Sequence, residues 1–179
     1  MPYSIEEHKH RFGAWAAASA ASVNRNCRFT VEAGKRILEN AGMHRLLSSP
    51  DNLPTPPNVD EQHRKWRSTV IAAAAVEHIT FTHGVAAKLI NIYLKAGFVY
   101  GGHHLHDSVT ALHPPIDRTL LTELANLNLG GFRGFWKEAM QVGWSNFNSD
   151  QYERVIANMR AAMAGSPLWE IEQHWRGYQ

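Results

Sequence analysis

The chain has 179 residues, a formal net charge of +2, 44% hydrophobic residues and 19% charged residues. This composition is typical of an ordinary globular protein, and it excludes a disordered or low-complexity chain. The length is sufficient for a sizeable core, so we expect residues 1–179 to form a single domain.

Nothing in the sequence predicts a membrane segment or a cofactor. The longest strongly apolar run, residues 70–76, is far shorter than the ~20 residues that span a bilayer. The first residues lack the basic and apolar regions of a secretion signal. The single cysteine, Cys27, excludes an intramolecular disulfide and any multi-cysteine metal site. We therefore expect a cytoplasmic monomer that contacts no membrane and carries no cofactor.

The first predicted helix starts after the capping box Ser4–Glu7 and continues through an alanine-rich stretch to about Ala21. Phe12 and Trp15 lie on the same face of this helix, which favours a role in the core. A second helix is predicted from Thr30, its cap, to residue 41.

Four prolines in residues 48–58 then predict an irregular loop. Asp60 is the predicted cap of a long helix that reaches about Ile79. Cations cluster in this helix and include Arg64 and Arg67. The cluster is either part of a basic stripe that contacts DNA or an ordinary solvated helix surface.

A turn that leads into a helix, at residues 82–97, is the segment around which the chain is organised. Gly84 allows a close backbone approach, and strong helix formers follow it. The unpaired amides of a helix N-terminus carry partial positive charge and suit a phosphate. We therefore expect this turn to contact a nucleic-acid backbone through Thr82, His83, Gly84 and Val85. Lys88 lies one turn further along the helix.

Asp117 follows two prolines and precedes the helical run 118–125, so it is the predicted N-cap of that helix. Backbone amides would keep its carboxylate ionised and rigid. Lys88 and Asp117 are the predicted catalytic pair. Arg118, the next residue, is a further candidate for a phosphate contact.

These residues resemble the helix-hairpin-helix (HhH-GPD) DNA glycosylase superfamily, in which a Leu-Pro-Gly-Val-Gly-x-Lys hairpin carries the catalytic lysine and a Val-Asp-Thr-His segment carries the catalytic aspartate. The chain departs from the pattern at His83, where proline is usual, and at Ala86, which replaces a glycine. Its long interval between lysine and aspartate is closest to that of the archaeal 8-oxoguanine branch. The matching positions are Gly84, Val85, Lys88, Asn91, Leu94, Phe98 and the pair Ile116-Asp117.

The resemblance implies an all-α fold, a compact bundle of short helices that contains a helix-hairpin-helix motif. It also implies a DNA glycosylase that flips a nucleotide out of double-stranded DNA and breaks its N-glycosidic bond. Asp117 would stabilise the positive charge that develops on the sugar, and attack by Lys88 would add a lyase step. The resemblance does not identify the base that is removed. It could be an oxidised or alkylated base, which implies DNA repair, or a bulky modified base of phage DNA, which implies host defence.

Four side chains are candidates for the pocket that holds the flipped base: Phe12, Trp15, Trp136 and His113. The superfamily builds part of its base pocket from N-terminal helices, which gives Phe12 and Trp15 a second interpretation as stacking surfaces. Trp136 ends a glycine-rich segment, residues 126–136, that is either a base-contacting loop or a flexible crossover.

Two alternative functions stay open. The chain could be a non-catalytic helix-hairpin-helix module that binds DNA, with Lys88 as a phosphate contact and Asp117 only as a cap. It could also be a metal-dependent hydrolase that uses the histidines of residues 103–107, since imidazole and carboxylate groups suit zinc, iron or manganese. Adjacent histidines rarely converge on one ion, so no metal site is predicted.

Two helices are predicted at the C-terminal end. Ser149 is expected to cap the first, which reaches Ala164. The second, residues 168–175, follows the favourable pair Ser166-Pro167. Its apolar side chains Trp169, Ile171 and Trp175 are predicted to be core anchors.

Overall fold

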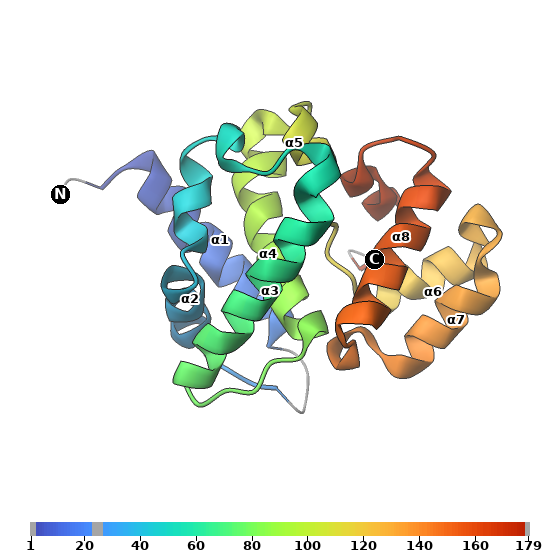
Figure 1. Cartoon of the computed structure of the whole chain (residues 1–179), viewed down its shortest axis with the longest axis horizontal. Coiled ribbons are helices and arrows are strands. Elements are labelled where there is room, and N and C mark those ends of the chain that lie inside the picture. The colour runs from blue at the N-terminus through green and yellow to red at the C-terminus, as the bar shows by residue number, and fades with distance from the viewer. Residues whose placement is uncertain (1–2, 23–26, 178–179) are drawn as a thin grey trace.

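The computed structural model describes residues 3–22 and 27–177 of the chain; residues 1–2, 23–26 and 178–179 lie outside the described ranges. Within these ranges the regular elements are helices and no strand occurs (Figure 1), which confirms the predicted all-α fold. None of the helices in these ranges is long and apolar enough to cross a membrane.

Eight α-helices make up most of the part of the chain that the structure describes: α1 (Ile5–Ala21), α2 (Val31–Asn40), α3 (Val59–Val76), α4 (His83–Leu94), α5 (Asp107–Thr110), α6 (Arg118–Asn126), α7 (Arg133–Val142) and α8 (Ser149–Met163). Short 3₁₀ segments connect them: η1 (Met43–Ser48), η2 (Pro50–Asn52), η3 (Pro56–Asn58), η5 (Leu129–Gly131), η6 (Trp144–Asn146) and η7 (Leu168–His174). A π-helix, η4 (Lys95–His103), extends α4.

Helix α4 joins two hydrophobic cores. The first core is built mainly from α1, α2, α3 and α4, and the second mainly from α6, α7, α8 and η7. Val85 and Ala86 of α4 belong to the first core, whereas their neighbour Ala87 belongs to the second. Trp144 of η6 packs against both cores. Figure 1 shows α6, α7 and α8 gathered at one end of the molecule, beside α3 and α4.

Helix α1 buries its alanines and exposes its aromatic residues. Phe12 and Trp15 are 52% and 54% exposed, so the prediction that they form a core stripe is wrong. The fully buried side chains of the helix include Ala14, Ala17 and Ala18. Small side chains allow α1 to approach α4 closely, a proximity that aromatic side chains on the same face would prevent.

The boundaries of α3 differ from the predicted ones at both ends. Asn58 precedes the helix, and Asp60 lies inside its first turn instead of capping it. The helix ends at Val76, before the predicted Ile79, because His78 adopts a left-handed conformation with φ of 59°. The chain turns back here toward α4.

Three other elements also differ from prediction. The helix that starts at residue 83 was expected to end near Gly97, but it continues as η4. The proline-rich segment 48–58 is not fully irregular, since prolines at the first positions of η2 and η3 start short 3₁₀ turns. Helix α8 is capped by Asn148, which forms a capping box with Gln151, and Ser149 is its first helical residue.

Candidate active site

Lys88 and Asp117 meet between the two cores. Helix α4 carries Lys88, and Asp117 is the N-cap of α6, as predicted. The backbone N–H of Leu120 donates a hydrogen bond to Asp117 Oδ1 over 2.8 Å. Lys88 Nζ donates to the other carboxylate oxygen, Oδ2, over 3.1 Å. Two residues 29 positions apart in sequence therefore form one ion pair whose carboxylate is held by the helix terminus.

The Lys88 side chain is buried inside the protein. The residue is only 6% exposed, and its Nζ lies 5.5 Å from the centre of the Trp144 ring. Burial lowers the pKa of the Lys88 ammonium below its ordinary value, and the carboxylate of Asp117 partly opposes this effect. A lysine in such surroundings loses its proton more readily than a solvated one, which favours nucleophilic chemistry.

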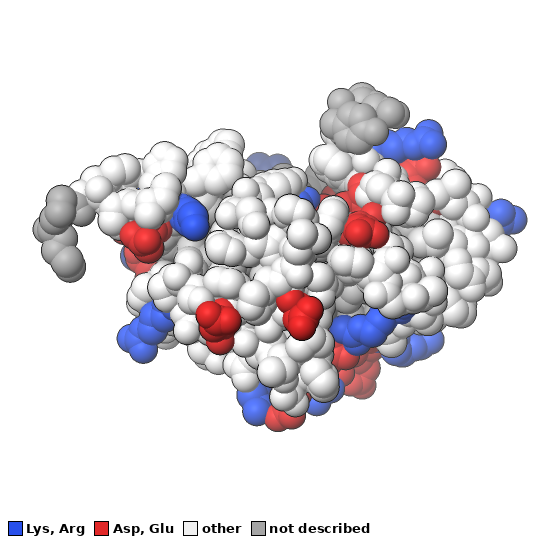
Figure 2. Space-filling model, turned by 90° about the horizontal axis from the view of Figure 1, so that it is seen from above, with Lys and Arg blue, Asp and Glu red and all other residues white. Residues whose placement is uncertain are grey.

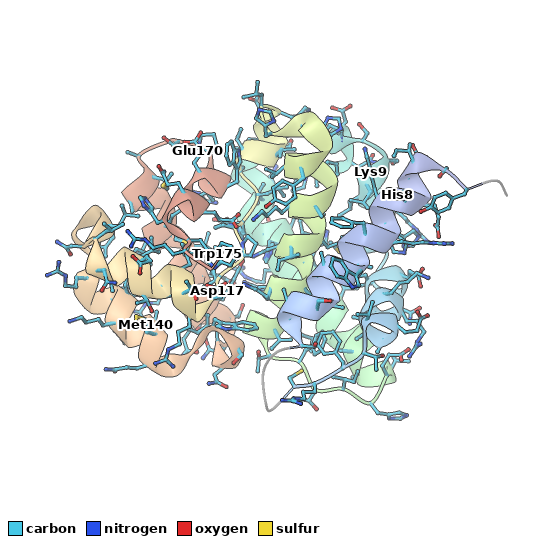
Figure 3. The ribbon with its side chains drawn as sticks, turned by 180° about the vertical axis from the view of Figure 1, so that it is seen from behind. His8, Lys9, Asp117, Met140, Glu170 and Trp175 are labelled. Carbon is cyan, nitrogen blue, oxygen red and sulfur yellow. The ribbon has the colours of Figure 1, made fainter. Side chains whose placement is uncertain are left out.

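Trp175 contacts the predicted catalytic pair, a position that its sequence surroundings do not indicate. Its indole N–H donates a hydrogen bond to Asp117 Oδ2 over 2.9 Å, beside the contact with Lys88. Figure 3 shows Trp175 next to Asp117 at the junction between the two halves of the molecule. The sequence predicts that Trp175 is a core anchor, together with Trp169 and Ile171. A partly buried indole N–H needs a partner, and this requirement is the signal that could have indicated a polar role.

A cavity of about 290 Å³ opens next to the ion pair. This volume approaches that of small-molecule sites in proteins. Lys95 and Glu172 form a second ion pair in its wall, and burial raises the pKa of the Glu172 carboxyl. The polar and aromatic side chains that line the cavity are Phe12, Lys88, Lys95, Tyr100, Asp117, Glu172 and Trp175.

The four candidates for a base pocket have different positions. Phe12 lines the cavity, and the ring of Trp15 lies 5.8 Å from the ring of Phe12 on the same helix. Trp136 is fully buried in the second core, where its indole N–H donates to the Leu129 carbonyl. His113 is also buried, with its ring nitrogens 2.8 Å from Asp60 Oδ1 and 3.1 Å from the Tyr152 hydroxyl. The polar ring atoms of Trp136 and His113 therefore already have partners within the protein, and neither residue lines the cavity.

The turn before α4 is covered by a segment of the second core. The amide of Gly84 donates to the carbonyl of Phe147 over 3.1 Å, and the amide of Val85 donates to Thr82 Oγ1 over 3.1 Å. Thr82 Oγ1 itself donates to the carbonyl of Ser145 over 2.7 Å. The expected phosphate contacts of these groups are therefore replaced by contacts within the protein. His83, the first residue of α4, is partly buried beside them.

Most of the predicted DNA-contacting cations have carboxylate partners. Arg67 is fully buried and pairs with Glu153 over 2.7 Å, so it cannot reach a phosphate at the surface. Arg64 pairs with the same carboxylate over 2.5 Å. Arg118 is exposed in the first turn of α6 and stays accessible. Figure 2 shows Lys and Arg side chains interspersed with Asp and Glu on the face seen there, without a continuous basic patch.

The histidines of residues 103–106 have separate surroundings. The His103 ring packs against Phe98, and the His104 ring packs against Trp169. His106 Nε2 lies 3.3 Å from Asp51 Oδ1. Among the residues that the structure describes, no three His, Cys, Asp or Glu side chains are grouped to hold a metal ion.

No protein-family model, curated protein or solved structure matches this chain.

Proposed function

We propose that the protein is a DNA glycosylase that removes a damaged or modified base, with Asp117 and Lys88 as its catalytic residues. One observation carries the proposal: a buried lysine and an N-cap aspartate, 3.1 Å apart, lie at the wall of a cavity of about 290 Å³. Side chains that suit a nucleobase line this cavity, since Phe12 and Trp175 supply aromatic surfaces and Glu172 supplies a hydrogen-bonding edge.

The first chemical step breaks the bond between C1′ of the sugar and the base. The electron pair of this bond goes to the base nitrogen, and positive charge develops on C1′ and the ring oxygen. The carboxylate of Asp117 stabilises this charge, because the amide of Leu120 and the side chain of Trp175 fix its position. The departing base, which leaves with the electron pair of the broken bond, then takes up a proton from water.

The second step adds a nucleophile to C1′. Water can attack and lose a proton to Asp117, which releases a sugar without its base. Alternatively, the neutral amine of Lys88 attacks, one proton of the attacking nitrogen moves to the ring oxygen as the bond between C1′ and this oxygen breaks, and a protonated imine remains. The lowered pKa of Lys88 supports the second route, since it increases the fraction of neutral amine.

The alternative of a non-catalytic helix-hairpin-helix module has less support. Such a module binds phosphates through the amides of its hairpin. In this protein the amides of Gly84 and Val85 already donate to other groups of the chain. The cavity beside Lys88 and Asp117 has no role in such a module.

An excision screen tests the proposed function. Oligonucleotides that each carry one oxidised, alkylated or bulky modified base are incubated with the protein, both as single strands and as duplexes, and released bases are measured. We expect one class of base to be released. Absence of release from every substrate would contradict the proposal.

Borohydride reduction of the reaction then identifies the nucleophile. If Lys88 attacks C1′, wild type gives a covalent adduct with DNA, and Lys88→Ala does not. Lys137→Ala, which removes an exposed lysine of α7, is the matched control and should give as much adduct as wild type. Excision without any adduct would assign the attack to water.

A further inference from the structure

A second, larger cavity adjoins the one beside Lys88 and Asp117. Its volume is about 560 Å³, and it lies between η4 and η7. The two cavities share three lining residues, Lys95, Tyr100 and Glu172, so they lie side by side along the junction of the two halves, and we call the two cavities together the groove. Figure 3 shows Asp117, Trp175 and Glu170 along this junction, where Asp117 and Trp175 line the first cavity and Glu170 lines the second.

Aromatic side chains are distributed along the whole groove. Phe12 and Trp175 line the first cavity, Trp169 lines the second, and Tyr100 lines both. Phe12 and Tyr100 are exposed, Tyr100 by 71%. A series of exposed or accessible rings along a groove is how proteins bind unpaired nucleic acid, because each base can stack on a ring.

Most of the features expected to hold a duplex are occupied within the protein, whereas Arg118 stays accessible. The amides of Gly84 and Val85 donate to Phe147 and Thr82, and Arg67 is buried. On the face shown in Figure 2, cations and anions are interspersed. Binding that relies on phosphate contacts needs a concentration of cations, whereas stacking does not.

The polar groups of the second cavity suit the edge of a nucleobase. Lys95 and Glu172 neutralise each other in the partition between the two cavities. Glu170 and Gln173 line the second cavity and offer oxygen atoms that accept hydrogen bonds. Carboxylate and amide oxygens accept from the exocyclic amino groups of cytosine and adenine.

We propose that the groove binds two consecutive nucleotides of an unpaired DNA strand, one base beside Lys88 and Asp117 and its neighbour in the cavity of Tyr100 and Trp169. The inference rests on the proposed function for the occupant of the first cavity. The proposed unpaired strand differs from the double-stranded substrate that the sequence predicts. In the unpaired strand the neighbouring base also leaves its stack and enters a cavity of its own. A neighbour with an exocyclic amino group is preferred over thymine.

Fluorescence anisotropy tests this inference without any catalysis. Labelled oligonucleotides of about eleven nucleotides are titrated as single strands and as duplexes, and the single strand should bind at least about tenfold more tightly. Affinity for the single strand should fall by less than about tenfold between 50 and 200 mM salt, since only a few phosphates are contacted. Replacing the nucleotides of an oligo-thymidine by cytidine should increase its affinity.

Two variants localise the binding to the second cavity. Tyr100→Ala and Trp169→Ala should each weaken single-strand binding by about fivefold or more. Tyr100 is mostly exposed, so its removal leaves the fold intact even if Trp169→Ala does not fold. Tyr3→Ala is the matched control, because Tyr3 is 60% exposed but lines neither cavity, and its affinity should equal that of wild type.

Equal or tighter binding of the duplex, absence of measurable binding, or wild-type affinity in Tyr100→Ala would overturn the inference. The excision screen is independent of these titrations. Single-strand preference without excision would refute the proposed function alone. Excision with equal efficiency from duplex and single strand would refute the inference alone.

Discussion

The two carboxylate oxygens of Asp117 have different roles. Oδ1 caps α6 by accepting from Leu120, whereas Oδ2 accepts from both Lys88 and Trp175. An asparagine could keep the cap through its oxygen, but its amide nitrogen would then face two donors. Substitution of Asp117 therefore affects the site and the stability together.

We expect Asp117→Asn to lower excision by about 100-fold or more, because the charge that stabilises C1′ is lost. The unsatisfied donors should also destabilise the fold by about 1–3 kcal/mol, equivalent to roughly 3–10 °C in melting temperature. The double variant Asp117→Asn, Lys88→Met removes the unpaired ammonium and should melt at a higher temperature than the single variant. Excision by Asp117→Asn at the wild-type rate would eliminate the proposed mechanism.

The protonation of Lys88 predicts how adduct formation depends on pH. Burial lowers its pKa below the ordinary 10.5, so the neutral amine accumulates as the pH rises toward the lowered value. With an oligonucleotide that already contains an abasic site, the rate of borohydride trapping should increase with pH and level off below 10.5. Circular dichroism at each pH verifies that the protein is folded. A rate that does not change with pH would indicate that deprotonation of Lys88 does not limit the attack.

At the scale of elements, the N-terminus of α4 depends on the segment 143–148 of the second core. A Cβ atom added at Gly84 would lie 1.8 Å from the carbonyl oxygen of Trp144 and 3.3 Å from Cβ of Phe147. Glycine is required here because two backbones approach closely. The close approach anchors the second core to the helix that carries Lys88.

Gly84→Ala should consequently destabilise the protein by about 3 kcal/mol or more, since α4 and the segment 143–148 must separate. For a chain of this length, such a loss of unfolding free energy corresponds to a decrease of at least roughly 6 °C in melting temperature. Gly134→Ala is the control, because a Cβ at this position of α7 meets nothing within 4 Å. It should melt at the wild-type temperature or slightly above. Equal melting of Gly84→Ala and wild type would contradict the packing described for α4.

Local signals were sufficient to predict the caps of several helices from the sequence. Thr30 and Asp117 are N-caps, as their positions before helical runs indicate. The resemblance of the segments around Lys88 and Asp117 to the HhH-GPD superfamily also predicted that these two residues act together. The contacts of Trp175 and Gly84 could not be predicted, because they join residues about 60 positions apart that no local pattern relates. Helix α1 was misjudged because its aromatic face was assumed to be more buried than its alanine face.

At the scale of the whole molecule, polar side chains connect α3 with α8, and one of them, Arg67, is fully buried. The Arg67 guanidinium of α3 donates to Glu153 and Ser149 of α8 and lies 4.4 Å above the Tyr152 ring. Asp60 of α3 likewise pairs with Arg160 of α8 over 2.7 Å. These contacts fix the second core relative to the first and so maintain the groove between them.

The pair of Arg67 and Glu153 gives a prediction for the stability of this arrangement. Glu153→Gln would leave the fully buried Arg67 without a counter-ion, which should cost about 3 kcal/mol and lower the melting temperature by roughly 6–12 °C at neutral pH. Glu61→Gln, which removes an exposed carboxylate of α3 that pairs with Lys65, is the matched control and should melt close to wild type.

The same pair predicts how this difference in melting depends on pH. The hydrogen bond from Arg64, assisted by those from Ser149 and Arg67, lowers the pKa of Glu153 from 4.5 to about 2. Because the folded-state pKa is lowered, the stabilisation is fully present above pH 4.5 and is lost as the pH falls toward 2. Melting curves of wild type and Glu153→Gln should therefore differ most at neutral pH and converge in acid. A constant difference down to pH 2 would show that the charge of Glu153 does not hold the two cores together.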